Sequence, residues 1–364
     1  MITQNSPNRP RPSVLLILSG ALPLVLLLFL FLTLGNPSPT VSAATTKIGL
    51  IADVGILADN GWNWLSYQGL LRAEQDFGVV GTVYTTTSET DLAPNLQQCA
   101  TDGNVLCIAI GFRAANAIQD VASAHPATKF AILDHIYASY STNVRGVQFY
   151  VNEAAYLAGV LAGSMSQTKV VGDIGGMEIP NVTAFTLPFQ NGARCAIPGA
   201  TTLLTYTNDF GNPELGAQVA QSLIAQGADV IFSPAGLTSV GAVMTATQSG
   251  KWGIGVDMDF YDTIFDHGTV TGSDKVLTSV LKKLDSGVYL TIRDVVSNTF
   301  TAGTVSYGLA AEGAGLAPYH EADSAIPVSL KARIERVEQD IITGRTDVNS
   351  ALCRRYLYLP VIKK

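Results

Sequence analysis

The feature that most constrains the fold of this chain is the alternation of short apolar segments with helical patterns from Lys47 onward. The apolar segments are rich in β-branched residues and apolar throughout, as strands buried on both faces of a sheet are. They are KIGLIAD, GTVYTT, VLCIAIG, KFAILD, VRGVQF, KVVGDIG, TTLLTY, DVIFSPAG and WGIGVDMD. Helical periodicity is found between most of these strands, in DLAPNLQQCA, FRAANAIQDVASA, NEAAYLAGVLAGSMS, ELGAQVAQSLIAQ and TSVGAVMTATQS. Such alternation predicts parallel sheets with right-handed crossovers, in doubly wound α/β domains.

The length and the order of the elements indicate two lobes. A chain of 364 residues can hold two domains of ordinary size, each with its own core. About half of the chain precedes VQFYVNEAAYLAGVLAG, and the alternation begins afresh with KVVGDIGGMEIP. We expect a first lobe of residues 44–150 with about 258–298, and a second lobe of residues 151–257 with about 299–345. The sequence assigns no role to the tail, residues 346–364.

The N-terminal segment has the pattern of an export signal. Two arginines precede an apolar run over residues 14–34, and Val41-Ser42-Ala43 matches a small-x-small cleavage site. An uncleaved anchor is the alternative, because the run reaches the roughly 20 residues that span a bilayer. In both cases residues 1–43 predict export, to the cell surface, the membrane or the periplasm. A lipid-bearing cysteine is not found there, since the first cysteine is Cys99.

The cysteines have structural rather than catalytic spacing. Cys99 and Cys107 flank a short turn between a predicted helix and a predicted strand, so they are the most plausible disulfide pair. Two buried free thiols are equally compatible with the sequence, because four cysteines allow three full pairings. No C-x-x-C motif indicates redox or zinc chemistry.

Charge and motifs exclude several functions. The formal net charge of -7 and the pI near 5.1 argue against a nucleic-acid partner, which clustered Lys and Arg would bind. The sequence has no G-x-x-x-x-G-K-[ST], H-E-x-x-H or G-x-S-x-G motif. The four histidines are scattered, and only His135 adjoins a strand end. We therefore expect no enzyme activity, no catalytic or metal-binding residues and no cofactor.

Polar residues and glycines stand at the carboxyl ends of the predicted strands. Ligands of open parallel sheets bind at this edge. The residues are Asp53, Gly111, Asp134, Gly176, Tyr206, Gly236 and Asp257. Each one taken alone is more readily a helix cap or a turn residue. Together they predict a cleft.

Carboxylates and an aromatic ring at this edge fit a nucleoside. A buried Asp53, Asp134 or Asp257 needs donors, which sugar hydroxyls, an amine or a lysine supply. Trp62 lies in the polar, glycine-broken stretch DNGWNWLSYQGL, where a helix that only packs would carry Leu or Ile. A ribose hydroxyl pair suits a carboxylate, and a flat base suits the face of Trp62. A glycosidase that uses Asp53 and Asp134 is the alternative.

Six ordered motifs resemble one family over nearly all of the chain from Lys47 to about Ala317. They are ADVGILADNGWNWLSYQGL, FAILD, NEAAYLAGVLAGSMSQTKVVGDIGGMEIP, DVIFSPAGLTSVG, GIGVDMD and VLTSVLKKLDSGVY. The chain resembles the basic membrane protein family of periplasmic-binding-like lipoproteins, whose best-known members are purine-nucleoside-binding components of ABC importers. The resemblance implies a type I periplasmic-binding-protein fold, with two lobes joined by a three-stranded hinge. It also implies a monomeric, extracytoplasmic receptor that hands an unchanged ligand to membrane permease subunits.

The resemblance also implies which residues contact the ligand. Trp62 and Phe210 align with two stacking phenylalanines of the family, and Lys282 with a lysine that reaches the ribose region. The whole predicted set is Asp53, Trp62, Asn63, Asp134, Phe210, Gly236, Asp257 and Lys282. The chain departs from the family at Trp62, at Gly61, where the family has Ser, and at Asn212, where it has Asp.

Two other functions stay open at this point. The first is a binding protein or sensor for a sugar or a small signalling molecule, and the second is a nucleoside hydrolase. A sugar requires several polar side chains around one aromatic face, whereas a base requires two opposed rings. The pair Trp62 and Phe210 therefore favours a base.

Overall fold

The computed structural model describes residues 46–57 and 61–353. The chain divides into two units, Met1–Ala44 and Thr45–Lys364. The predicted signal peptide or anchor, residues 1–43, lies outside the described residues. Within the described part of the chain, no helix is both long and apolar enough to cross a membrane.

The first sheet is entirely parallel. Its strands are β1 (Lys47–Ile51), β2 (Val80–Tyr84), β3 (Leu106–Ile110), β4 (Lys129–Leu133), β5 (Val144–Phe149) and β11 (Gly303–Tyr307), in the spatial order β11-β5-β4-β3-β1-β2. The strands β3 and β4 are buried almost throughout, as their continuous apolar sequences predict.

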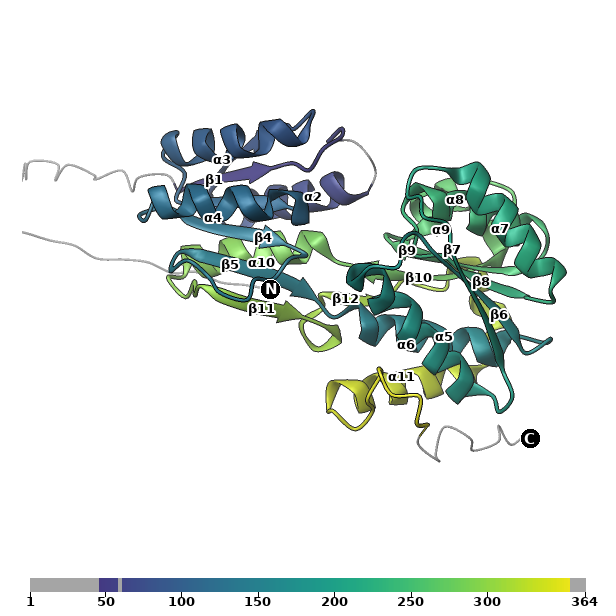
Figure 1. The fold of residues 1–364 in the computed structure, drawn as a ribbon. Coiled ribbons are helices and arrows are strands. Elements are labelled where there is room, and N and C mark those ends of the chain that lie inside the picture. The colour runs from purple at the N-terminus through teal and green to yellow at the C-terminus, as the bar shows by residue number, and fades with distance from the viewer. Residues whose placement is uncertain (1–45, 58–60, 354–364) are drawn as a thin grey trace, which may run out of the picture. The chain divides into compact units, whose positions relative to one another are not determined.

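Helices cover both faces of this sheet (Figure 1). The covering helices are α2 (Trp62–Phe77) and α10 (Leu284–Val296) on one face, and α3 (Leu92–Thr101) and α4 (Ala115–Ala124) on the other. The helix α4 buries Ile118, Val121 and Ala122, which are spaced to lie on one stripe. Gly78, at φ 66°, ends α2 in the left-handed conformation that favours glycine.

The second sheet is parallel except at one edge. Its strands are β6 (Val170–Gly175), β7 (Thr201–Tyr206), β8 (Val230–Phe232), β9 (Trp252–Asp257), β10 (Val276–Lys282) and β12 (Ala314–Leu316), in the order β12-β10-β9-β8-β6-β7. The edge strand β12 runs antiparallel to β10. Both sheets thus have the doubly wound topology that the strand-helix alternation predicts.

Helices also sandwich the second sheet (Figure 1). They are α7 (Pro213–Ala225) and α8 (Leu237–Gln248) on one face, and α5 (Val151–Met165) and α6 (Pro180–Ala196) on the other, with α11 (Val328–Ile342) against α5. The short elements are α9 (Phe260–Thr263), η1 (Glu89–Asp91), η2 (Phe112–Ala114), η3 (Asp266–Gly268), η4 (Ser273–Lys275), η5 (Leu309–Ala311) and η6 (His320–Ala325).

The expected lobe boundaries assign β10 and β11 to the wrong sheets. We expected residues 258–298 with the first lobe, but β10 pairs with β9 in the second sheet, and only α10 packs on the first. We expected residues 299–345 with the second lobe, but β11 pairs with β5 in the first sheet. The apolar pattern of a strand does not specify the sheet that it joins, so the sequence misplaced both crossings.

The chain passes between the two sheets three times, after β5, after β10 and after β11. Backbone hydrogen bonds tie the three connections together: Tyr150 N–H donates to Tyr307 O at 2.9 Å, and Lys283 N–H donates to Gly313 O at 3.0 Å. The Glu153 carboxylate also accepts from Leu309 N–H at 2.8 Å. These connections correspond to the three-stranded hinge that the resemblance implies.

Two disulfides are present, Cys99–Cys107 and Cys195–Cys353. The first joins α3 to β3 across the turn that suggested it. The second was not expected, and it ties the start of the C-terminal tail to α6. Asn191 Nδ2 donates to Val348 O at 3.2 Å nearby, and Val348 is buried. The tail is therefore part of the second lobe up to Cys353, and residues 354–364 lie outside the described residues.

A buried ion pair holds α10 to the first sheet and makes a test of stability possible. Arg145, on β5, is only 1% exposed, and its Nη1 lies 2.7 Å from Asp294 Oδ2. The Arg145 Nε donates to Thr301 O at 2.9 Å, and the guanidinium lies 4.3 Å from the Phe300 ring centroid. Loss of one partner of a buried pair leaves an uncompensated charge.

We expect Asp294→Ala to lower the free energy of unfolding by about 3–5 kcal/mol, because the Arg145 guanidinium stays buried without its carboxylate. Urea denaturation measures this difference. The control Asp274→Ala removes the exposed partner of Lys275 and should cost at most about 1 kcal/mol. Similar small losses in both variants would show that Thr301 and Phe300 alone stabilise Arg145.

Candidate functional site

Each sheet has a point where successive connections run to opposite sides of one strand, at β1 in the first sheet and at β6 in the second. In the first sheet, β2 and β3 lie on opposite sides of β1, and in the second, β7 and β8 lie on opposite sides of β6. A crevice forms at the carboxyl ends of strands where the connections diverge in this way. The predicted residues Asp53, Trp62 and Asn63 follow β1, and Gly236 and Phe210 follow β8 and β7. The topology thus brings them to the edge where ligands of such sheets bind.

Asn63 braces the loop that carries Asp53. The Asn63 Oδ1 accepts from Asp53 N–H at 2.8 Å, and Asn63 Nδ2 donates to Asp53 O at 3.2 Å and to Ile56 O at 3.4 Å. Asn63 is 2% exposed. Through these contacts Asn63 positions the β1–α2 loop, and its predicted contact with a ligand stays a prediction.

The Asp53 carboxylate forms an ion pair with Arg113, a residue that the sequence analysis missed. Arg113 Nη1 lies 2.8 Å from Asp53 Oδ2, and Arg113 Nε lies 3.1 Å from Glu89 Oε1. Burial raises the pKa of the Asp53 carboxyl, against the hydrogen bond from Val54 N–H and the charge of Arg113. Arg113 lies in η2, directly beyond β3. Its place next to the strand-end Gly111 was the available sequence signal.

The indole of Trp62 lies beside this pair. A Cβ atom at Gly111 would be 3.2 Å from Trp62 Nε1 and 3.1 Å from Asp53 Oδ2, so glycine allows the close approach. Gly111 also has φ 82°, which glycine adopts readily. The Trp62 Nε1 atom is buried without a hydrogen-bond partner among the described residues. It is a donor that a ligand could use.

A charged triad joins the strand ends of the two sheets. Lys282, at the end of β10, is 4% exposed, and its Nζ donates to Asp134 Oδ2, beyond β4, at 3.0 Å. Burial lowers the pKa of the Lys282 ammonium, but the Asp134 and Asp257 carboxylates outweigh it and raise that pKa. Asn181 Nδ2 donates to the same Asp134 oxygen at 3.1 Å. The triad is therefore one ammonium between two carboxylates.

Both carboxylates of the triad stand on unusual backbone. Asp134 has φ 57° and Asp257 has φ 64°, in the left-handed region that residues with a side chain rarely adopt. Burial raises the pKa of the Asp257 carboxyl, with the Lys282 charge opposing it. The Asp257 Oδ1 atom is buried without a hydrogen-bond partner in the described part of the chain. A residue that its surroundings hold in the left-handed region is a candidate for a functional position.

Lys282 also links the triad to two aromatic rings. Its Nζ lies 5.0 Å from the Trp62 ring centroid and 5.2 Å from that of Phe185, on α6. Both distances are within the range of cation–π attraction. The contacts thus bring Trp62, Asp134, Asp257 and Lys282 together. Asn181 and Phe185 are additions, since the motif GGMEIP ended before them in the sequence analysis.

Phe210 and Gly236 form a second group, at the carboxyl edge of the second sheet. A Cβ atom at Gly176 would lie 2.2 Å from Phe210 Cε1, and one at Gly236 would lie 2.9 Å from Phe210 O. The ring therefore rests on a strand-end glycine, and Gly236, at φ 58°, passes close to its backbone. Phe210 is 37% exposed, so one part of the ring is open to contact.

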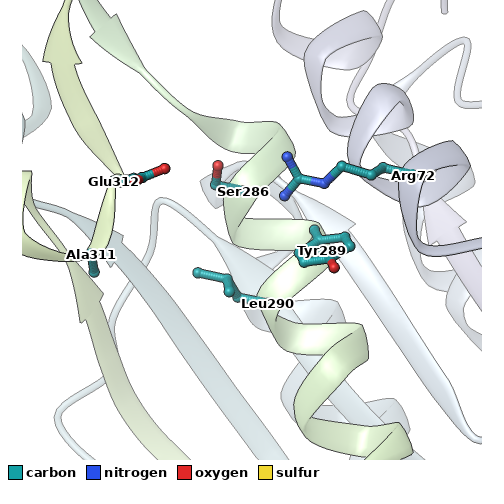
Figure 2. A pocket seen from close by; sticks show the side chains of 6 residues that line it. All are labelled: Arg72, Ser286, Tyr289, Leu290, Ala311 and Glu312. Atoms are coloured by element: carbon teal, nitrogen blue, oxygen red, sulfur yellow. The ribbon is translucent and has the colours of Figure 1, made fainter. Parts of the chain in front are cut away.

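A pocket of about 350 Å³ lies elsewhere, against α2, α10 and η5. Figure 2 shows its lining residues, Arg72, Ser286, Tyr289, Leu290, Ala311 and Glu312. The Arg72 guanidinium lies 3.8 Å from the Tyr289 ring centroid and pairs with Asp285 at 3.6 Å. Because Arg72 already contacts Tyr289 and Asp285, and none of the predicted site residues lines this pocket, we place the candidate site at the strand ends.

Curated relatives are similar to this chain over most of its length. The CD4+ T-cell-stimulating antigen of Listeria monocytogenes is 30% identical over 321 residues, which are 83% of this chain and 88% of that protein. Basic membrane protein A of Borreliella burgdorferi is 27% identical and covers 90% of this chain and 94% of its own length. An uncharacterized lipoprotein of Pyrococcus abyssi is 29% identical, over 77% of this chain and 71% of its own.

Solved structures confirm the predicted fold class. An ABC transporter solute-binding protein from Aeropyrum pernix superimposes with a TM-score of 0.69 at 24% identity, over 82% of this chain and 92% of its own. A protein described as a transcriptional activator of the comK gene, from Bacillus halodurans, gives a TM-score of 0.70 at 22% identity, over 82% and 98%. Likeness at this identity shows the fold alone.

Family membership rests on a match over most of the chain. Residues 45–351 match the Bmp family, described as ABC transporter substrate-binding protein PnrA-like. The match spans both sheets and the connections between them, and it confirms the family that the six motifs indicated. This chain belongs to the Bmp family of PnrA-like ABC transporter substrate-binding proteins.

Proposed function

We propose that this chain binds a purine nucleoside at its strand ends and presents it, chemically unchanged, to an ABC permease. The observation that carries the proposal is the ion pair of Lys282 with Asp134, at 3.0 Å, beside the Trp62 ring. It places a buried anion and a buried cation next to an aromatic face. A nucleoside has a matching polar sugar and flat base.

The triad fits the ribose. Two neighbouring hydroxyls can donate to the Asp134 carboxylate, and the Lys282 ammonium can donate to a hydroxyl oxygen in return. Both side chains are nearly removed from water, at 11% and 4% exposure, where unmade hydrogen bonds are costly. A ligand that satisfies them is therefore strongly preferred over one that lacks hydroxyls.

The rings fit the base. Trp62 offers a face and an indole N–H without a partner among the described residues, and Phe210 offers a partly open ring in the loop after β7. A base stacked on an aromatic side chain gains about 1–3 kcal/mol. Two rings contributed by different sheets support a clamp, as the resemblance implies.

Binding at this site would also favour closure of the lobes. Asp134 directly follows β4 of the first sheet, whereas Lys282 and Asp257 belong to the second sheet. A ligand that contacts residues of both sheets binds best when the two sets are close, so it shifts the population toward the closed state. Permease subunits that distinguish closed from open receptors would then accept loaded protein. Export, a monomeric state and delivery to a permease are parts of this proposal.

Ligand identification tests the proposal directly. Protein purified from its native host should release a purine nucleoside on denaturation, detected by mass spectrometry. Calorimetry should then show binding of inosine, guanosine or adenosine, and weaker or no binding of ribose and galactose. Release of free base during incubation would instead establish a nucleoside hydrolase, and tight binding of a free sugar would establish a sugar receptor.

We expect Asp134→Ala to weaken nucleoside binding by about 2–4 kcal/mol, because a charged acceptor of ribose hydroxyls contributes about 1.5–3 kcal/mol per hydrogen bond. The free base should bind almost as well as it does to the unmodified protein. Calorimetry with adenosine and adenine separates the two effects. The control Asp340→Ala removes a carboxylate that pairs with exposed Arg345 and should change neither affinity. Equal losses for both ligands would mean that Asp134 only shapes its turn.

We expect Trp62→Ala to lower nucleoside affinity tenfold or more, because the base loses a stacking face. Trp62→Phe, which restores the residue of the family, should keep most of the affinity. Addition of nucleoside should change tryptophan fluorescence in the unmodified protein, but not in Trp62→Phe.

Trp64, two positions further along α2 and 36% exposed, provides the matched control. Trp64→Phe should keep both the affinity and the change in fluorescence. If Trp62→Ala instead lowers the melting temperature strongly and leaves affinity unchanged, Trp62 is a packing residue and the base lies elsewhere.

A further inference from the structure

A cluster of carboxylates and imidazole lies in the second lobe, outside the nucleoside site. Asp259 precedes α9, Asp262 lies within it, and His320 begins η6. One oxygen of each carboxylate and one ring nitrogen of His320 lie within 4.8 Å of one another. His320 Nε2 is already 2.7 Å from Asp259 Oδ2. All three residues are partly buried.

A second histidine contacts the same cluster. His267 Nδ1 lies 3.1 Å from Asp262 Oδ1. Two of the four histidines of the chain therefore face one pair of carboxylates, although they come from segments far apart in the sequence. The Tyr261 ring stacks on His320, with centroids 4.1 Å apart and planes at 7°. The stack fixes the plane in which the His320 nitrogen points.

The cluster concentrates negative charge. Among the described residues, Asp259 and Asp262 form ion pairs with imidazoles, which are weaker counter-charges than lysine or arginine. A bound cation would neutralise this charge.

We propose that Asp259, Asp262 and His320 bind a divalent transition-metal ion, with Zn²⁺ as the best match. Carboxylate oxygens and an imidazole nitrogen are zinc ligands, at about 2.0–2.2 Å from the ion. The imidazole disfavours Mg²⁺ and Ca²⁺, which take oxygen ligands. The ion takes the place of the proton between His320 and Asp259, and Asp262 completes three protein ligands. His267 positions the Asp262 carboxylate from outside, as partners of metal ligands commonly do.

The bound ion would connect two parts of the second lobe. Asp259 and Asp262 lie just beyond β9, two and five positions after the site residue Asp257, and His320 lies just beyond β12. A ligand bond to each part joins them across the edge of the sheet. Because the ion binds only where these parts are folded together, it should stabilise the native chain.

Equilibrium dialysis of the full chain against ZnCl₂, with metal analysis, tests the proposal. We expect one Zn²⁺ per chain in the presence of excess Mg²⁺, and a melting temperature raised by a few degrees. His320→Ala and Asp262→Asn should each lower Zn²⁺ affinity at least tenfold. Asp262 is 43% exposed, so the isosteric variant Asp262→Asn should fold. It tests the proposal even if His320→Ala does not fold.

Two variants serve as matched controls. Asp266→Asn alters a neighbouring carboxylate that bonds to Thr269, and His125→Ala alters an exposed imidazole that bonds to Gln97. Both should bind Zn²⁺ as the unmodified chain does. The proposal is overturned if the unmodified chain binds no Zn²⁺, or if the cluster variants bind as much as the controls. Nucleoside binding, measured separately, is expected in every one of these variants.

Discussion

Parallel pairing is the constraint on which the rest of this molecule depends. All strands of a parallel sheet point the same way, so their carboxyl ends share one edge. Helices cover both faces of each sheet, which leaves the edges as the place where polar side chains can gather. The candidate site, with Asp53, Asp134, Asp257 and Lys282, consists of residues that end or directly follow strands. Their chemistry is a consequence of the topology.

The Lys282 ammonium can be buried because carboxylates lie beside it. An isolated ammonium as little exposed as Lys282 would lose its proton, because desolvation disfavours the charged form. The flanking carboxylates of Asp134 and Asp257 reverse that tendency. The same arrangement leaves Asp257 Oδ1 without a hydrogen-bond partner among the described residues. A ligand with hydroxyl donors would therefore enter a site where the Lys282 charge is compensated but the hydrogen bonds of Asp257 are incomplete.

Sequence periodicity predicted the regular parts of the fold well and the C-terminal crossings poorly. The nine expected strands correspond to β1 through β9. The sequence analysis did not name β10 as a strand, since its segment VLTSVLK contains Thr278, Ser279 and Lys282, all of which the fold buries. It also omitted α6, where Pro188 interrupts the helical pattern. Close packing of α6 on α5, at Gly159 and Gly192, holds that helix together.

The sequence predicted only part of the candidate site, because sequence patterns do not show which side chains meet in the folded chain. Strand ends and the family resemblance pointed to Asp134 and Lys282, but neither could show that the two side chains meet. Arg113 and Asn181 have no periodic signal, because Arg113 lies in the three-residue η2 and Asn181 lies in the first turn of α6, a helix that the sequence analysis omitted. The histidine contacts of Asp259 and Asp262 were invisible as well, since His267 and His320 come together only in the folded second lobe.

The disulfide between Cys195 and Cys353 has a consequence for the covalent architecture. It closes a ring whose ends are 158 residues apart in the sequence, and the ring contains β7 through β12 and the helices α7 through α11. Two of the three passages between the sheets lie inside it. A protease that cuts the backbone once anywhere in this ring produces two fragments that remain one molecule until the sulfurs are reduced. In an oxidising environment, the two fragments of a chain cut once in this ring would therefore stay covalently linked through Cys195 and Cys353.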